Sequence, residues 1–154
     1  ECLVGSEMCI RDSCCKTLII CLFYKYETEL HMEKLLVFHL DDNNLKKLKQ
    51  ITGALKVRVE EVLSSDYLKP LEMIANKTAS PLIQPFSGKV PAESLIVFCD
   101  FTEKKMDKLL ASLRRDQVVI DYKAVLTPTN RKWNVMRMYL EMQAEKAAYQ
   151  KNKA

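Results

Sequence analysis

The residue pair best suited to covalent chemistry is Cys99 with His39. A thiol becomes a nucleophile when a base or a positive field lowers its pKa, and histidine is a common base. Cys99 ends an apolar run, and His39 ends a similar run earlier in the chain. If the two runs form neighbouring strands, the two side chains would meet. Thiol catalysis is therefore one hypothesis, although cysteine and histidine at strand ends are more often packing residues.

A metal or disulfide cluster is suggested by five further cysteines near the start of the chain, which are Cys2, Cys9, Cys14, Cys15 and Cys21. However, residues 4–13 read VGSEMCIRDS, which is similar to the in-frame translation of a transposase sequencing adapter. We therefore expect residues 1–31 to be a non-native translation and Met32 to be the native start. On that expectation Cys99 is the one remaining cysteine, and no metal site, disulfide or cofactor is predicted.

The composition bounds the class of protein. The chain has 154 residues, with 24 Lys and Arg against 20 Asp and Glu, which gives a net charge of +4. From Met32 onward it is long enough for one core, so we expect a single domain, 32–154. No run reaches the roughly 20 apolar residues of a membrane span, which favours a soluble cytoplasmic protein without membrane contact. The mild basic excess permits binding to nucleic acid or to an acidic partner without requiring either.

A strand-helix-strand-helix pattern occurs twice. The segments EKLLVFH (33–39) and ESLIVFC (93–99) align without a gap, and each is typical of a strand buried on both faces. Each is followed by an amphipathic helix and then by an alternating strand, at 56–63 in the first copy and 117–126 in the second. This similarity predicts an internal duplication.

The two halves are 32–78 and 93–150, joined by a linker, 79–92, that contains three prolines and a glycine. We expect an α/β fold, an α+β sandwich of the ferredoxin-like type, with one sheet of about four strands and the helices packed on it. The pattern does not predict the strand order. The second helix of the first half, after Asp66, should be the weaker copy, because Pro70 is tolerated only in a first turn.

Helix starts are predicted at residues whose side chains can cap free backbone N–H groups. In chain order these are Asp42 or Asn43, Asp66, Thr102, and Asn130 or Thr129.

The second half contains a distinctive junction, LTPTNRKW (126–133), between its last strand and its last helix. Together with the strand end VFCDF, this stretch resembles a bacterial family known only as a domain of unknown function, number 3783, over about residues 89–150. The resemblance implies a small cytoplasmic protein. It brings no activity, substrate or catalytic residue with it.

The junction would also suit an anion, because a helix N-terminus with hydroxyl and basic side chains can hold a phosphate group. The candidate ligand residues are Thr127, Thr129, Asn130, Arg131 and Trp133. The alternative is an ordinary helix cap, with Trp133 filling the core.

The last helix carries two apolar stripes on roughly opposite faces. The first comprises Trp133, Met136, Leu140, Ala144 and Ala147, and the second comprises Val135, Met138, Tyr139, Met142 and Tyr149. One stripe can pack on the sheet, and we expect the second, rich in methionine and tyrosine, to be exposed as a surface for self-association or for a protein partner. The alternative is a helix sandwiched within the monomer.

Both halves place lysines on the exposed side of the first helix, namely Lys46, Lys47 and Lys49, then Lys104, Lys105 and Lys108. Such a basic face would follow a phosphate backbone, but no aromatic ladder or RNA-reading pattern accompanies it. We therefore expect a non-enzymatic module for protein association or ligand-responsive regulation. Weak, sequence-indifferent nucleic-acid binding is the alternative, and thiol catalysis by Cys99 comes third.

Overall fold

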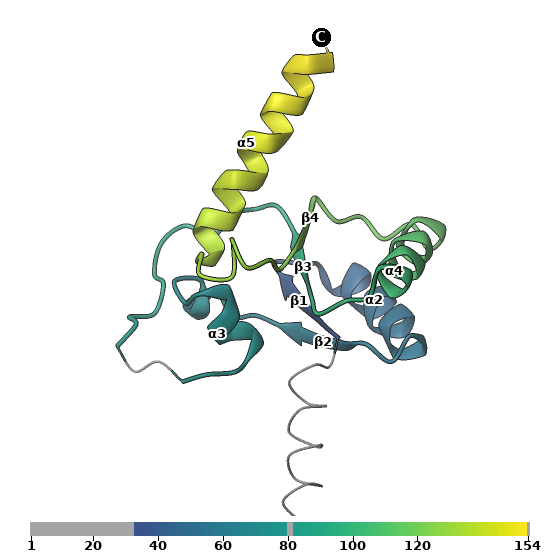
Figure 1. Cartoon of the computed structure of the whole chain (residues 1–154), viewed down its shortest axis with the longest axis horizontal. Coiled ribbons are helices and arrows are strands. Elements are labelled where there is room, and N and C mark those ends of the chain that lie inside the picture. The colour runs from purple at the N-terminus through teal and green to yellow at the C-terminus, as the bar shows by residue number, and fades with distance from the viewer. Residues whose placement is uncertain (1–32, 80–81, 154) are drawn as a thin grey trace, which may run out of the picture. The chain divides into compact units, whose positions relative to one another are not determined.

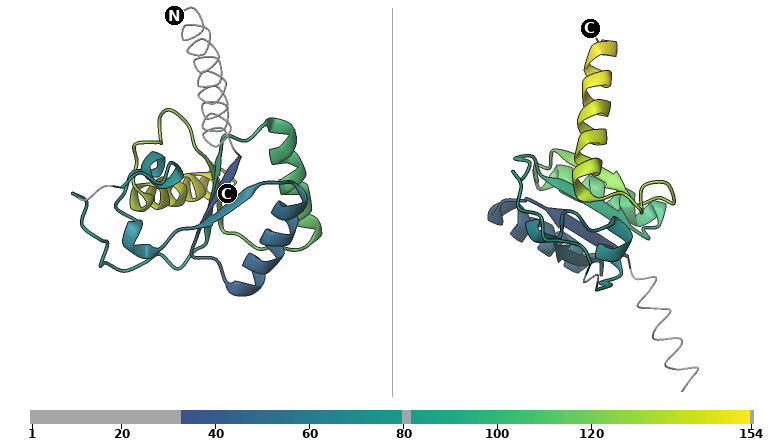
Figure 2. Two further views of the ribbon diagram at one scale, coloured as in Figure 1. Left: turned by 90° about the horizontal axis from the view of Figure 1, so that it is seen from below. Right: turned by 90° about the vertical axis from the view of Figure 1, so that its left-hand side faces the viewer.

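The computed structural model describes residues 33–79 and 82–153 of the chain. The predicted non-native segment 1–31, with its five cysteines, lies outside the described residues. The described residues form one four-stranded mixed sheet with helices packed on it (Figures 1 and 2). The predicted α+β class and the single sheet of four strands are therefore confirmed.

The first half consists of β1 (Lys34–Phe38), α2 (Asp42–Ala54), β2 (Arg58–Glu61), a 3-10 turn η1 (Ser64–Asp66) and the short α3 (Leu71–Ala75). The second half consists of β3 (Leu95–Cys99), α4 (Glu103–Arg115), β4 (Tyr122–Val125) and the long α5 (Val135–Lys153). In each half the first strand has five residues, the helix 13 and the second strand four. α3 begins directly after Pro70, whereas Asp66 was expected to cap this helix and Pro70 to lie inside its first turn.

The strand order is β2-β1-β3-β4. β1 and β2 are parallel, β3 and β4 are parallel, and the central pair β1 and β3 is antiparallel. In a ferredoxin-like fold the βαβ units are split, whereas here the two strands of each unit are direct neighbours. The ferredoxin-like expectation was therefore wrong. The two strands that are buried along their whole length take the centre of the sheet, and the more polar β2 is left at its edge.

The two halves correspond with an offset one residue larger than the sequence alignment predicts. β1 begins at Lys34 and β3 at Leu95, so that Phe38 corresponds to Cys99. The alignment had instead matched His39 with Cys99. A shift of one residue moves every side chain to the other face of a sheet, and burial on both faces hides this parity in the sequence. The internal duplication itself stays a prediction.

The core forms two layers, one on each face of the sheet. On one face α3 and α5 cover the inner side chains of the strands, including Leu36, Phe38 and Val97. On the other face α2 and α4 cover Leu35, Val37, Ile96 and Phe98. Figure 2 shows the two pairs of helices on either side of the strands. This arrangement decides which side of each helix is available to a partner.

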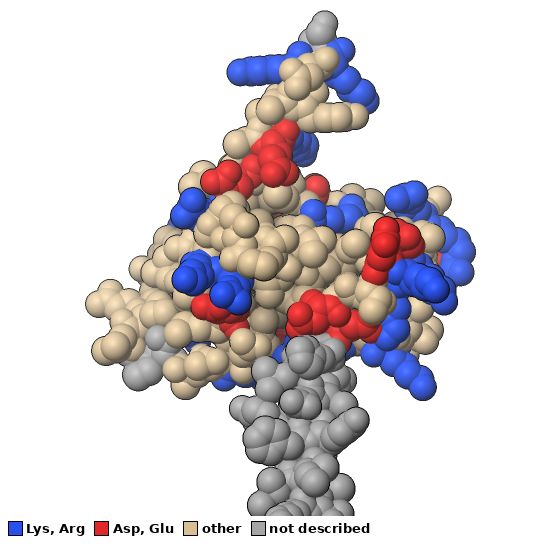
Figure 3. All heavy atoms as spheres, viewed as in Figure 1, with Lys and Arg blue, Asp and Glu red and all other residues tan. Residues whose placement is uncertain are grey.

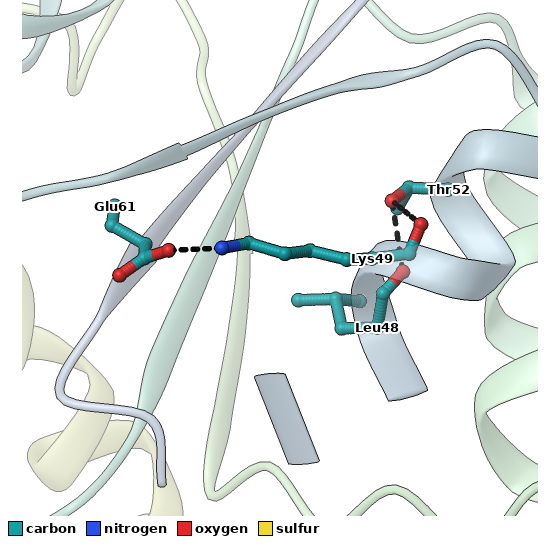
Figure 4. A network of polar contacts seen from close by, with 4 residues as sticks. All are labelled: Leu48, Lys49, Thr52 and Glu61. Carbon is teal, nitrogen blue, oxygen red and sulfur yellow. Dashed lines mark hydrogen bonds and ion pairs between the residues drawn. The ribbon is translucent and has the colours of Figure 1, made fainter. Parts of the chain in front are cut away.

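Polar contacts from α2 hold the edge strand. Lys49 forms an ion pair with Glu61 of β2 (Figure 4). Within the helix, the buried hydroxyl of Thr52 donates to the carbonyl oxygen of Leu48 at 2.8 Å.

The strand predicted at 117–126 is shorter in the structure. β3 begins at Leu95, which pairs with Tyr122, so residues before Tyr122 have no strand partner in β3. Val118 and Ile120 still bury their side chains from the preceding connection.

Two of the predicted helix caps in the first half were wrong. α2 is capped by Asp41, whose carboxylate accepts a hydrogen bond from the N–H of Asn44 at 3.1 Å. Asp42 and Asn43 already lie inside that helix. Asp66 belongs to the turn η1 and caps no α-helix.

The caps in the second half also differ in detail. Thr102 precedes α4 as predicted, but its hydroxyl donates to a carboxylate oxygen of Glu33 at 3.1 Å instead of capping the helix. At the start of α5 the side-chain oxygen of Asn134 accepts from the N–H of Arg137 at 2.9 Å. Asn134 is therefore the cap in place of Asn130 or Thr129.

Three helices end in a left-handed residue that is not glycine. Lys56, Lys77 and Gln117 follow α2, α3 and α4 with φ values of 56°, 53° and 54°. After α4, the N–H of Val118 donates to the carbonyl oxygen of Leu113 at 2.9 Å, and the N–H of Gln117 donates to that of Arg114 at 3.2 Å. These bonds are those of a Schellman motif, in which glycine is the usual left-handed residue.

We expect Gln117→Gly to raise the free energy of unfolding by about 0.5–1 kcal/mol, because glycine adopts a positive φ without strain at Cβ. Urea denaturation followed by circular dichroism measures the change. Gln117→Ala keeps the Cβ atom and serves as the control. An alanine variant as stable as the glycine variant would contradict this account of the turn.

Candidate functional site

A hollow opens beyond the carboxyl ends of the parallel strands β3 and β4, which is where open α/β sheets commonly bind ligands. Its volume is about 250 Å³. The lining residues are Asp100, Leu126, Thr127, Pro128 and Arg131 from the second half and Glu72, Ala75 and Asn76 from the first. The fold thus brings two residues of the predicted anion junction, Thr127 and Arg131, to one concave place.

The side chains of this junction are already engaged with the loop itself. The N–H of Thr127 donates to the side-chain oxygen of Asn130 at 2.8 Å, and the N–H of Asn130 donates to the hydroxyl of Thr127 at 3.3 Å. The side-chain amide of Asn130 also donates to the carbonyl oxygen of Val125 at 2.9 Å. Thr129 is exposed and does not line the hollow. These bonds close a stable turn and leave few groups directed at a ligand.

The basic and aromatic members of the junction also differ from the prediction. Arg131 Nε lies 3.6 Å from a carboxylate oxygen of Glu72, so its charge is balanced within the domain. Trp133 precedes α5 instead of lying in its first turn, and the guanidinium of Arg137 lies 4.6 Å from the centre of its ring. The first N–H of α5, that of Val135, donates to the carbonyl oxygen of Tyr67 at 3.1 Å. The prediction that the junction forms a helix N-terminus was therefore wrong.

Cys99 and His39 do not meet. β1 and β3 are neighbours, but their antiparallel register pairs Cys99 with Lys34 and places His39 beyond Phe38 at the other end of the strands. At about 3.4 Å per residue, the two residues lie roughly 17 Å apart. Cys99 is 1% exposed, and burial, with Asp100 nearby, raises the pKa of its thiol to about 12. The contact on which the thiol-enzyme hypothesis depended was therefore wrongly predicted.

A second hollow, of about 330 Å³, lies at the opposite end of β3 and collects His39, Ser94 and Asp121. The hydroxyl of Ser94 donates to a carboxylate oxygen of Asp121 at 2.9 Å, and the N–H of Ser94 donates to the same oxygen at 2.8 Å. These backbone and hydroxyl bonds lower the pKa of Asp121. A nucleophilic serine would donate to a histidine instead. The Ser94–Asp121 pair joins the starts of β3 and β4. The spacing of these two residues in the sequence did not indicate the contact.

Lys34 is a buried charged residue that the sequence analysis missed. Its ammonium donates to the carbonyl oxygen of Ala75, in the last turn of α3, at 2.8 Å. Lysine side chains can satisfy the last carbonyl groups of a helix in this way. The signal in the sequence was a lysine directly before the apolar residues 35–38. Its contact is structural, because it joins β1 to α3.

α5 buries the stripe that was predicted to be exposed. Val135, Met138 and Tyr139 are almost fully buried, and Met142 packs against the same cluster. Among the predicted interface residues, Tyr149 is the exception, with 64% of its surface exposed. The spacing defines two stripes but does not say which one meets the sheet, and contacts with the first half, such as the backbone bridge between Pro70 and Asn134, lie at the start of α5. A helical pattern contains no such information.

The exposed side of α5 carries only the second part of the first stripe, because Trp133 and Met136 are partly buried against the core cluster. Leu140 is 65% exposed, and Ala144 and Ala147 are exposed as well. Beyond Met142 every described residue of the helix, 143–153, is exposed. Figure 1 shows this part of α5 extending beyond the sheet.

The two predicted basic faces lie on one layer, because α2 and α4 run next to each other over the same face of the sheet (Figure 1). Lys46, Lys104 and Lys108 are exposed there. The other three lysines contact groups of the domain: Lys47 the carbonyl oxygen of Asp116, Lys49 the carboxylate of Glu61, and Lys105 that of Glu33. Figure 3 shows acidic side chains interspersed with the basic ones on this part of the surface.

Neither a metal centre nor a membrane helix emerges from the described part of the chain. Within 33–79 and 82–153, no three His, Cys, Asp or Glu side chains gather in a way that would hold a metal ion. Nor does any helix in these ranges combine the length and apolar character needed to cross a membrane.

Comparison with known proteins supports the family resemblance. Residues 94–149 match the model of a family described as a domain of unknown function (DUF3783). This range holds β3, α4, β4 and most of α5, including the junction and the exposed stripe. No curated protein and no solved structure matches the chain.

Proposed function

We propose that this domain is a non-catalytic protein-association module and that it acts through the free face of α5, defined as Leu140, Ala144 and Ala147. The observation that carries the proposal is the course of α5, which continues for 11 exposed residues, 143–153, past its last packed turn. Helices of fewer than about 12–15 residues are marginal in water, because helical stability in proteins comes mainly from tertiary packing. A partner would supply packing that the domain itself does not give to this segment.

The residue types of the free face suit a helical partner. Leu140, Ala144 and Ala147 are spaced i, i+4 and i+7, the pattern by which a helix presents anchors to a groove or to another helix. The leucine provides apolar area, and the two alanines let a partner backbone approach closely. The thiol of Cys99 is buried and its pKa is raised, and the hydroxyl of Ser94 donates to Asp121, which favours association over catalysis.

Site-specific photocrosslinking tests this function in cells that naturally make the chain. A photoreactive amino acid at Ala144 is expected to yield a discrete protein adduct, and the same amino acid at Lys108, on the exposed side of α4, serves as the matched control. The mass of the adduct shows whether the partner is a second copy or another protein. The photoreactive amino acid is also placed at Leu140 and at Ala147, and the absence of a discrete adduct at all three positions would contradict the proposal.

Nucleic-acid binding is the second candidate function, and the adjacency of α2 and α4 favours it, because it places Lys46, Lys104 and Lys108 on one layer. If this layer binds a phosphate backbone, the triple replacement of these lysines by glutamate should abolish salt-sensitive retention on immobilised DNA. The control replaces Lys146, Lys151 and Lys153 of α5 by glutamate, which changes the net charge of the chain by the same amount. Equal losses in the two variants would show that net charge, and not the α2–α4 layer, determines retention.

A further inference from the structure

The outer side of β2 is a free edge of the sheet. Among the described residues no strand pairs with it. The N–H of Arg58 donates to the carbonyl oxygen of Glu33, and that of Val62 donates to the carbonyl oxygen of Val37. Because successive residues of a strand direct their backbone groups to opposite sides, those of Val59 point away from β1. An edge of this kind can accept a further strand.

β2 also contains an acceptor that lacks a donor. Oε1 of Glu60 is buried and has no hydrogen-bond partner among the described residues, and the side chain is 12% exposed. Lys77 Nζ lies 3.3 Å from this oxygen and Arg58 Nε lies 3.7 Å from it, so its charge is balanced without hydrogen-bond geometry. Buried acceptors of this kind are few in native proteins, and each one requires an explanation.

The free edge borders the largest of the described hollows, with a volume of about 480 Å³. All of β2 lines it, together with residues of α3 that include Met73 and Ile74. Glu60 faces the same side of the sheet as Val62, which packs against the core cluster under α3. The hollow therefore has room for side chains of an added strand directly beside Glu60.

We propose that β2 pairs antiparallel with β2 of a second copy of this chain, about a two-fold axis at Val59. In this register Arg58 of each copy lies opposite Glu60 of the other, on the same face of the joined sheet. The two are a non-hydrogen-bonded pair, in which Cα atoms are about 4.5 Å apart and side chains are closest. The guanidinium of one copy then lies beside the Glu60 carboxylate of the other and pairs with its charge.

The charge pattern of β2 selects this register over its neighbours. A two-fold axis at Arg58, Glu60 or Glu61 would place that residue opposite itself, so that like charges face each other across the joined edge. Only the axis at Val59 pairs opposite charges within the strand, and it does so twice. This self-complementarity is the reason to assign the edge to a second copy. The surface is separate from the free face of α5, and the inference does not depend on the function proposed for that face.

Sedimentation of the full chain, from micromolar to near-millimolar concentration, tests the pairing. We expect a dimer that is weakened about tenfold or more by Arg58→Glu and likewise by Glu60→Arg, because each change converts both cross-strand attractions into repulsions. An equimolar mixture of the two variants should restore dimerisation, since both pairs are again opposite in charge. A mixture that stays as dissociated as the single variants would overturn the proposal.

Two further variants separate backbone pairing from other effects. Val59→Pro removes an N–H that points away from β1, and it should give a monomer. Should this variant fail to fold, the charge mixture still decides the question. Ala144→Lys on α5 should leave the dimer intact, which distinguishes a failure of this pairing from a failure of the proposed function. A wild-type chain that is monomeric throughout, with the edge kept for the strand of another protein, would overturn the inference.

Discussion

Met138→Lys is expected to destabilise the domain strongly, even though the sequence alone placed this residue on an exposed interface. Met138 is 1% exposed and lies in the core cluster with Val135 and Tyr139. A lysine there would bury an ammonium group in an apolar cluster, without a carboxylate or a carbonyl group placed to receive it. We expect a loss of about 3–5 kcal/mol in the free energy of unfolding. That is a large part of the roughly 5–15 kcal/mol that stabilises a typical domain.

Urea denaturation monitored by circular dichroism measures this loss. Ala144→Lys introduces the same charge on the exposed side of the same helix, and its effect should stay within about 0.5 kcal/mol. Met138→Leu keeps the apolar volume and should cost less than about 1.5 kcal/mol. If Met138→Lys were as stable as Ala144→Lys, α5 would not pack on the sheet through this face.

Cys99 is expected to react with iodoacetamide about a thousandfold more slowly in the folded chain than in the unfolded chain. Burial raises the pKa of its thiol from 9.0 to about 12, and each unit lowers the thiolate fraction at neutral pH about tenfold. The buried position also restricts access of the reagent. Mass spectrometry of the peptide that contains Cys99, with and without urea, gives the two rates. Similar rates in both conditions would reopen a catalytic role for this thiol.

The same shift predicts a loss of stability at alkaline pH. The thiol ionises more readily in the unfolded chain, so its contribution is fully present below pH 9 and is lost as the pH rises towards 12. Burial also raises the pKa of the Tyr139 phenol, which acts in the same direction. Cys99→Ala should therefore reduce the fall in unfolding free energy above pH 9 by about 1.4 kcal/mol per pH unit. An unchanged slope in this variant would contradict the shift.

Local patterns predicted most of the elements of this fold. The apolar runs at 33–39 and 93–99 are the central strands, and the apolar stripes that follow them belong to α2 and α4. These features are local, because burial of a whole run or of one helix face is recorded in the spacing of apolar residues.

The candidate sites were predicted less well, because each depended on a contact between distant segments. Neighbouring strands were foreseen for Cys99 and His39, but the antiparallel direction that separates them was not. Thr127 and Asn130 were recognised as polar residues near a helix start, yet they bond to each other and not to a helix. The residues that cap or close such turns compete with one another, and only the folded backbone selects among them.

The sequence by itself determined the class of fold, the number of strands and the resemblance of the second half to an uncharacterised family. Only the tertiary structure decided the strand order, the one-residue offset between the halves and the face of α5 that meets solvent. The physical reason is that hydrophobic spacing shows that a side chain is buried but not what it is buried against. Pairing direction and helix rotation are settled by long-range backbone contacts, such as the bridge between Pro70 and Asn134.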